Sequence, residues 1–178
     1  MSAASTEPYY FQGLIVQPDC QFCPLRGSKM VLPDGPYPAR MCVVGEGPGA
    51  EEERLGQGFV GASGEAQWEM CWNGGDGGFT RDRVWVSNSA LCLPRAVTLP
   101  GHVKISKEQA KFMSVKACRR RLIGELLSVT QGDPDAVIVA VGALAFQSLT
   151  GNWHAKIHDY RGSINPVDLK DLWEELNR

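Results

Sequence analysis

A chain of 178 residues, 43% of them hydrophobic, has the size and composition of one globular domain, and its 20 glycines and 11 prolines are too few for a collagen-like or low-complexity chain. Its longest apolar run, residues 136–146, is too short to span a bilayer and its N-terminus lacks the basic and apolar regions of a secretion signal, so we expect a cytoplasmic protein without a membrane partner. The net charge of −2 hides a basic segment, residues 81–121, with 10 Lys and Arg against 2 Asp and Glu, which is typical either of a phosphate-facing surface or of a solvated helix face.

The first predicted elements of the domain are two strands separated by a glycine-rich loop and a helix. Met41 to Val44 is a short apolar run that stops at Gly45, as expected of a buried strand feeding a loop. After the loop, the spacing predicts a short helix from Glu65 to Trp72. Val84 to Ser87 is the second predicted strand, and Asn88 stands at its C-terminal end.

A loop and a long helix are predicted next. Leu91 to Ile105 holds two prolines and a glycine, which indicates a loop. Ser106 and Gln109 have the spacing of a capping box, in which each side chain bonds the other residue's backbone N–H. We therefore expect a helix that runs from this box to about Ser128.

The last part of the chain is predicted to hold a strand and two helices. Ala136 to Val141 has the strongest strand pattern, and a helix from Ala143 to Thr150 follows it, with Gly151 as its stop. Asn165 before Pro166 predicts the start of a last helix, because proline suits the first helical position.

Strands that alternate with helices predict an α/β fold, with a mostly parallel central sheet between two layers of helices. In such a three-layer α/β/α fold, ligands bind outside the carboxyl ends of the strands. Both the segment Gly45–Gly49 and Asn88 are expected at that edge.

Four cysteines have a spacing that allows them to converge. Cys20 and Cys23 form a C-x-x-C pair, Cys92 follows the second strand and Cys118 lies on the long helix. From spacing alone a four-cysteine zinc site is the first expectation, and an iron-sulfur cluster needs the same number of ligands. The alternative is a set of unrelated buried thiols. Burial is also the simplest explanation for the two remaining cysteines, Cys42 and Cys71.

The glycine-rich segments offer a carboxylate and an aromatic ring. The segment Gly45–Gly49 has neither the dinucleotide fingerprint nor the phosphate-binding lysine, so nucleotide binding is not favoured. It does hold Glu46, on a backbone stiffened by Pro48 and flanked by glycines that allow a ligand to approach. Phe59 lies between glycines, where its ring either stacks on a base or fills the core.

These segments, taken in order along residues 20–162, resemble the uracil-DNA glycosylase superfamily, and most closely its iron-sulfur branch, often called family 4. The matching segments are C-x-x-C-P-L at 20–25, V-V-G-E-G-P-G at 43–49, G-x-G-F-V-G-x-S-G at 56–64, V-S-N-S-A-L-C at 86–92, Cys118 on a helix, V-G-A-L-A at 141–145, and Arg161-Gly162.

The resemblance implies a monomeric DNA-repair hydrolase that flips uracil out of DNA and cleaves its N-glycosidic bond. Phe59 would stack on the base, and Asn88, whose amide offers both a donor and an acceptor, would read its edge. Glu46 would place the attacking water, next to a sugar that becomes positively charged. The remaining substrate-binding residues would be Gly45, Gly47, Pro48 and Gly49. The resemblance also favours a structural 4Fe-4S cluster over zinc, with the ligands Cys20, Cys23, Cys92 and Cys118.

The chain departs from the family pattern near its end. In that branch a His-Pro-Ser element follows the Arg-Gly, whereas the 16 residues after Gly162 contain no histidine. We therefore expect the domain to be either a truncated enzyme or a non-catalytic iron-sulfur DNA-binding module. This domain is expected to comprise residues 14–178, and residues 1–13 are expected to form a flexible tail. One sub-branch binds uracil covalently through a loop histidine, and His102 falls in that region.

Overall fold

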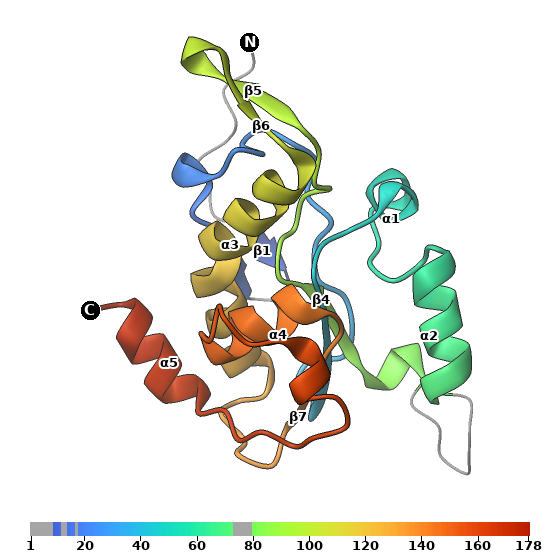
Figure 1. Ribbon diagram of the computed structural model, residues 1–178. Coiled ribbons are helices and arrows are strands. Elements are labelled where there is room, and N and C mark those ends of the chain that lie inside the picture. Colours follow the sequence, from blue (N-terminus) through green and yellow to red (C-terminus); the bar gives the residue numbers. More distant parts are fainter. Residues whose placement is uncertain (1–8, 12–13, 17, 73–79) are drawn as a thin grey trace.

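A computed structural model describes residues 9–11, 14–16, 18–72 and 80–178 (Figure 1). At its centre is a 3-stranded parallel sheet in the order β4-β3-β7. The strands are β3 (Met41–Gly45), β4 (Trp85–Asn88) and β7 (Val137–Ala140), which confirms the three predicted strands to within one residue at every end. In the central strand β3, Cys42, Val43 and Val44 are all 0% exposed, because both faces of the sheet are covered.

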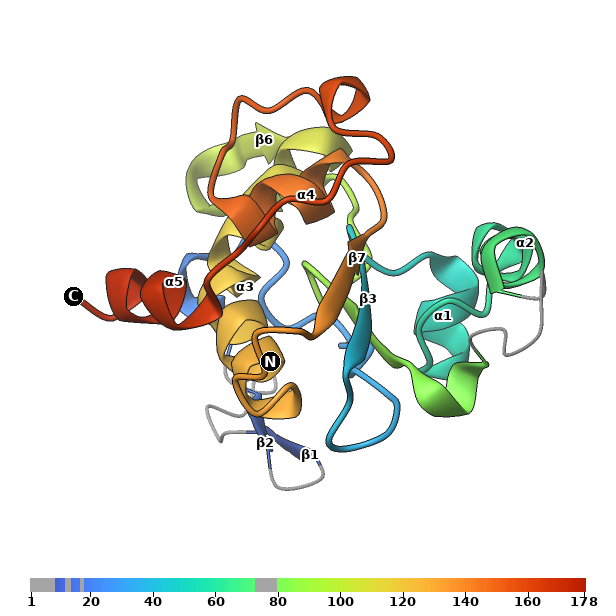
Figure 2. The same ribbon diagram turned by 90° about the horizontal axis from the view of Figure 1, so that it is seen from below.

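Helices cover both faces of this sheet. They are α1 (Ala50–Leu55), α2 (Ala62–Trp72), α3 (Lys107–Val129), α4 (Ala143–Thr150) and α5 (Leu169–Leu176), with 3-10 turns η1 (Cys20–Phe22), η2 (Arg81–Arg83), η3 (Pro100–His102) and η4 (Ile157–Asp159). Figure 2 shows α3, α4 and α5 on one side of the sheet and α1 and α2 on the other, which confirms the three-layer α/β/α fold. No helix within the described ranges is long and apolar enough to cross a membrane.

Each face of the sheet has its own apolar core. Val44 and Trp85 share one core cluster with residues of α3, such as Leu122, and of α4, such as Leu149. The core cluster on the opposite face is smaller, and in it Phe59 packs with the valines at 43, 84 and 86. Phe59 therefore belongs to a core cluster as well as to the glycine-rich loop.

Local signals set the ends of α3 and α4. The capping box at α3 is complete, since Ser106 Oγ accepts from Gln109 N at 3.1 Å and Gln109 Oε1 accepts from Ser106 N at 2.9 Å. Gly151 ends α4 in the left-handed conformation, with φ 73°. Both helices begin and end within a residue or two of the prediction.

A small hairpin precedes the sheet in the chain. It pairs β1 (Tyr9–Phe11) with β2 (Leu14–Val16), and β2 lies against α3. The expected tail, residues 1–13, thus includes β1, and its other residues lie outside the described ranges.

Three sequence predictions were wrong. The expected loop at 91–105 contains a hairpin of β5 (Val97–Leu99) and β6 (Val103–Ile105), which projects from the body in Figure 1. The glycine-rich loop contains α1, whose first turn holds three glutamates that complement the helix dipole. The last helix begins at Leu169, because Asp168 caps it through the N–H groups of residues 170 and 171.

Candidate active site

The candidate site begins where β3 and β4 end side by side. Gly45 is paired with Asn88, and two backbone hydrogen bonds continue the pairing past the strands, from Ser89 N to Gly45 O at 2.8 Å and from Ala90 N to Glu46 O at 3.1 Å. The structure therefore places Glu46 and Asn88 at the same edge of the sheet, where ligands of parallel sheets bind.

The side-chain amide of Asn88 is nearly buried and has no hydrogen-bond partner among the described residues. Asn88 is only 5% exposed. Its Oδ1 lies so close to Gly45 that a Cβ there would collide with it, and its Nδ2 is 3.6 Å from the Cβ position of Gly58. The polar groups of such buried residues are normally hydrogen-bonded, and the two amide atoms of Asn88 are not among the fully enclosed unpaired atoms of the described residues, so the amide is open to solvent. It therefore presents a donor and an acceptor that a ligand can satisfy.

Phe59 lies beside this amide in a strained backbone conformation. Its φ is 57°, in the left-handed region that bulky residues avoid, and its ring atom Cζ is 2.9 Å from the Cβ position of Gly45. Two hydrogen bonds hold the loop, from Trp68 Nε1 to Phe59 O at 3.1 Å and from Arg81 Nη2 to Gly58 O at 2.8 Å. Strain of this kind is retained where the surrounding structure fixes it, often at functional sites.

The carboxylate of Glu46 is held from two sides. Its Oε1 accepts the backbone N–H of Leu144, near the start of α4, at 3.0 Å. Its Oε2 forms an ion pair with Lys111 of α3, and both side chains are partly exposed, 23% for Glu46 and 32% for Lys111. Gly142 lies so close to Glu46 that any side chain there would displace it. The sequence analysis missed Lys111, whose only signal is its place in the basic segment.

The remaining predicted substrate-binding residues form the turn from β3 to α1. Pro48 is buried, and Gly49 is the N-cap of α1. A Cβ at Gly47 would meet Pro94 and the backbone of Ala90 at ordinary contact distances of 3.6 to 3.7 Å. Of this group, Gly45 is the one that lies against the Asn88 amide and the Phe59 ring.

The four predicted metal ligands lie in one region of the fold. Burial first, and then the neighbouring Cys118, raises the pKa of the Cys20 thiol and raises that of Cys92 to about 12. Burial is again the main cause that raises the pKa of Cys23 to about 11, with Cys118 and Cys20 contributing. Three thiols thus share Cys118 as an electrostatic neighbour.

This donor set suits a group bound by four thiolates, although no group of three or more ligating side chains within the described ranges is close enough to hold a metal ion as it stands. Cys42 is a buried thiol of β3, as expected, and burial raises its pKa to about 12. The side chain of Cys71 lies outside the described part of the chain.

The three histidines lie at the surface. His102 is exposed in the turn between β5 and β6, with φ 61°. His154 is exposed as well, and the exposed His158 has its Nε2 2.9 Å from Oδ1 of Asp159.

Only some of the cations of the basic segment, residues 81–121, are exposed at the surface. Arg119 is 9% exposed and Arg121 is 3% exposed, so two arginines of the run at 119–121 cannot face phosphates. The exposed cations of the segment are Arg83, Arg95, Lys104, Lys107, Lys116 and Arg120.

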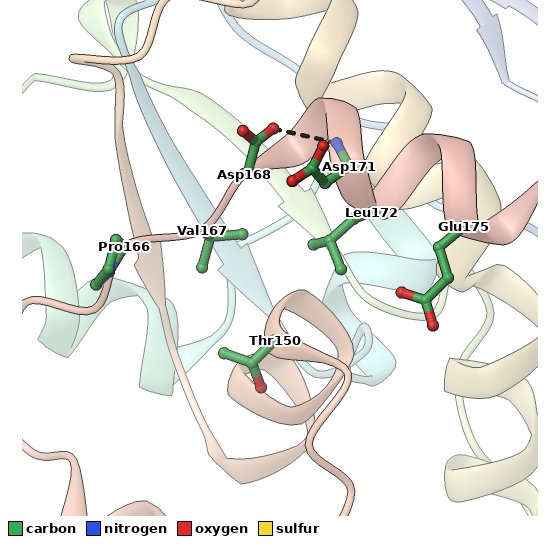
Figure 3. A pocket seen from close by; sticks show the side chains of 7 residues that line it. All are labelled: Thr150, Pro166, Val167, Asp168, Asp171, Leu172 and Glu175. Carbon is green, nitrogen blue, oxygen red and sulfur yellow. Dashed lines mark hydrogen bonds between the residues drawn. The ribbon is translucent and has the colours of Figure 1, made fainter.

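A separate pocket of about 240 Å³ lies between the ends of α4 and α5 (Figure 3). Its lining includes Thr150 and the acidic residues Asp168, Asp171 and Glu175. Asp168 already caps α5, and the negative charge of the lining is unfavourable for a DNA phosphate.

Known proteins resemble this chain over most of its length. The family described as "Uracil DNA glycosylase superfamily" matches residues 32–174. A protein named "Type-4 uracil-DNA glycosylase" from Thermotoga maritima is 32% identical over 151 residues, which are 84% of this chain and 69% of that protein. Another with the same name, from Pyrobaculum aerophilum, is 28% identical over 160 residues, 89% of this chain and 74% of that protein.

Proposed function

Because the chain belongs to the uracil-DNA glycosylase superfamily, we propose that it is a DNA-repair enzyme that hydrolyses the N-glycosidic bond of uracil in DNA. The observation that carries the proposal is the nearly buried Asn88 amide, which has no partner within the described ranges and lies beside Phe59 and Glu46 at the ligand-binding edge of the sheet.

The amide accounts for the choice of base. Once uracil is flipped out of the stack, Asn88 Nδ2 donates to a uracil carbonyl and Oδ1 accepts from the ring N–H. Cytosine has the reversed donor and acceptor at these positions, so an amide held in this orientation would leave both groups unsatisfied. The ring of Phe59 supplies the stacking surface next to them.

Glu46 supplies the negative charge for the reaction at the sugar. A water oxygen bonds to C1′ while the bond from C1′ to the base nitrogen breaks, uracil leaves with the bonding electrons as an anion, and the water releases one proton to solvent. The sugar is positively charged at that moment, so a fixed carboxylate lowers the barrier. The N–H of Leu144 and the ammonium of Lys111 hold Glu46 in place, which leaves its remaining lone pairs for the water.

We further propose that Cys20, Cys23, Cys92 and Cys118 hold a 4Fe-4S cluster, with zinc as the alternative. The chemistry of the donor set and the shared proximity to Cys118 support this assignment. The cluster would supply a structural link between the N-terminal segment, the loop after β4 and α3, because hydrolysis needs no redox change.

The test is an assay on an oligonucleotide that carries one uracil, with the thymine oligonucleotide of the same sequence as the control. We expect free uracil and an alkali-labile abasic site from the first substrate alone. Tight binding of uracil-containing DNA without base release would overturn the enzymatic assignment and leave a binding module.

A further inference from the structure

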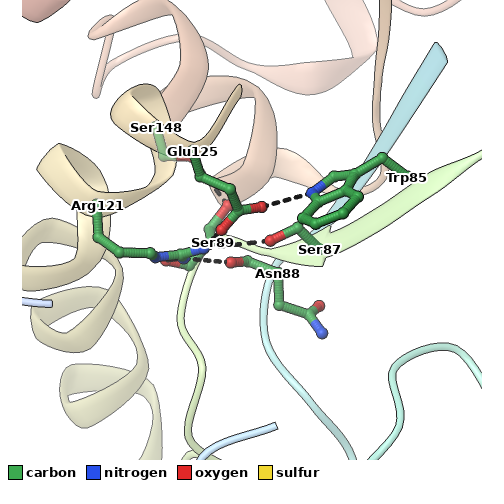
Figure 4. A network of polar contacts seen from close by, with 7 residues as sticks. All are labelled: Trp85, Ser87, Asn88, Ser89, Arg121, Glu125 and Ser148. Carbon is green, nitrogen blue, oxygen red and sulfur yellow. Dashed lines mark hydrogen bonds and ion pairs between the residues drawn. The ribbon is translucent and has the colours of Figure 1, made fainter. Parts of the chain in front are cut away.

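A buried polar network joins α3 to the end of β4 (Figure 4). Arg121 and Glu125, one helical turn apart, form an ion pair whose side chains are both 0% exposed. Arg121 Nη2 donates to the backbone carbonyl of Asn88 at 2.6 Å and to that of Ser89 at 3.2 Å. The guanidinium thus binds the two peptide groups that follow the strand.

The same pair also contacts the strand further back. Arg121 Nη1 donates to Ser87 Oγ at 3.2 Å, and Glu125 Oε1 accepts from Trp85 Nε1 at 2.8 Å. The network therefore spans the whole of β4 from one helix.

Arg121 lies at the edge of β4 that faces away from β3, where the backbone carbonyl of Asn88 needs a hydrogen-bond donor. The backbone of Val86 bonds Asp34 on the side of β4 away from β3, at 2.7 and 2.9 Å. Backbone groups two residues apart point to the same edge, so the carbonyl of Asn88 points there too. No strand pairs with Asn88 on that side within the described ranges, and Arg121 takes the place of one.

Stability alone is a poor reason for this arrangement. Removing two charges from water is costly, and well-packed apolar residues often replace such a pair without loss of stability. The Nε of Arg121 is also buried without a hydrogen-bond partner in the described part of the chain. An ion pair with these costs is more readily explained by the geometry that it imposes.

We infer that Arg121, held by Glu125, is a positioning residue that sets the direction of the Asn88 amide, an inference that rests on the proposed role of Asn88 in reading uracil. The sheet pairing with Gly45 holds the backbone before Asn88, and the hydrogen bond from Arg121 to the Asn88 carbonyl fixes the peptide plane after it, so the two together set the direction of the Asn88 side chain. The second hydrogen bond, to the Ser89 carbonyl, holds the next peptide group. Figure 4 shows the result, with the carbonyl of Asn88 turned toward Arg121 and its amide pointing away from α3.

The test compares two variants that differ in what they contact. The double variant Arg121→Met with Glu125→Leu removes both buried charges together, so neither is left unpaired. The control is Arg119→Met, which changes a neighbouring buried arginine of α3 that donates to Ser148 O, on α4 rather than on β4, at 2.8 Å. Arg121→Lys, which keeps the charge but not the forked donor, carries the test if the double variant does not fold.

The kinetic readout is the split between kcat and KM on uracil-containing DNA. We expect the double variant and Arg121→Lys to lower kcat at least tenfold with KM nearly unchanged, because DNA affinity comes from phosphate contacts elsewhere. Arg119→Met should lower the melting temperature without this loss of kcat. Full kcat in a folded double variant would overturn the inference.

A second readout does not depend on activity. The side-chain NH₂ resonances of Asn88, assigned through Asn88→Asp, should shift or broaden in the Arg121 variants and stay in place in Arg119→Met. If the wild type releases no uracil but these resonances respond, the proposed function fails and the positioning role stands. If they do not respond, the positioning role is wrong whatever the enzyme does.

Discussion

Gly45 and Asn88 are paired at the ends of two parallel strands, and the amide oxygen of Asn88 occupies the space where a side chain on Gly45 would lie. The same space borders the ring of Phe59. The absence of a Cβ at Gly45 is therefore what allows the amide and the ring to approach each other.

The variant Gly45→Ala tests this relationship directly. The added methyl group would displace both the amide and the ring, so we expect a loss of about 1–3 kcal/mol in unfolding free energy and a larger loss of uracil release. Thermal melts and the glycosylase assay measure the two effects. Gly61→Ala is the control, because its Cβ would meet no atom closer than 3.8 Å. Equal activity of the two variants would contradict the packing described for Asn88.

Asn88→Asp tests the reading of the base. The change removes the amide donor and places a negative charge beside the uracil carbonyl, so we expect uracil release to fall about 100-fold or more. Single-turnover rates measure the effect. The matched control is Asn152→Asp in an exposed turn, where Oδ1 accepts from His154 N at 3.2 Å and the new carboxylate can still do so. Unchanged discrimination between uracil and cytosine in Asn88→Asp would return Asn88 to a structural role.

Phe59→Ala tests the stacking surface. Loss of one base stack should weaken binding of uracil-containing DNA by about 1–3 kcal/mol. Because Phe59 also packs with Val43 and Val86, we expect a lower melting temperature as well. Titrations with uracil-containing and thymine-containing DNA separate the two roles, since a purely structural ring would weaken both to the same extent.

Cys118→Ala tests the cluster. Purified without oxygen, the wild type should be brown and contain iron and sulfide, and the variant should lose the colour and part of its stability. Cys42→Ala removes a buried thiol of β3 that is not among the proposed ligands and should keep the colour. If metal analysis of the wild type finds zinc and neither iron nor sulfide, the four cysteines hold the alternative metal and not a 4Fe-4S cluster.

The exposed lysines of the basic segment test the DNA surface. Neutralising Lys104, Lys107 and Lys116 should lower the slope of log Kd against log salt by about 0.9 for each DNA phosphate that a lysine no longer neutralises. Lys170→Gln changes an exposed lysine on α5 and should leave the slope unchanged. A slope that is the same in all variants would assign these lysines to a solvated face only.

Local interactions are what the sequence by itself determined. The capping box of Ser106 and Gln109 and the stop at Gly151 act within one or two helical turns, so their spacing along the chain is sufficient to place α3 and α4. The strand ends at Gly45 and Asn88 follow from apolar runs that stop, and the family resemblance rests on these same segments. The hairpin at 97–105 was not predicted because its strands have only 3 residues each, which is too short for a periodic signal.

The tertiary structure decided which side chains meet. Lys111 reaches Glu46 across 65 positions of sequence, and Arg121 reaches the carbonyl of Asn88 across 33, because α3 packs against the sheet with these residues facing its carboxyl edge. The same packing buries Arg119 and Arg121 and leaves Arg120 exposed. Counting charges along the chain cannot predict which of these arginines is exposed. Spacing along a helix predicts which residues share a face, whereas contacts with the sheet determine which of the faces is buried.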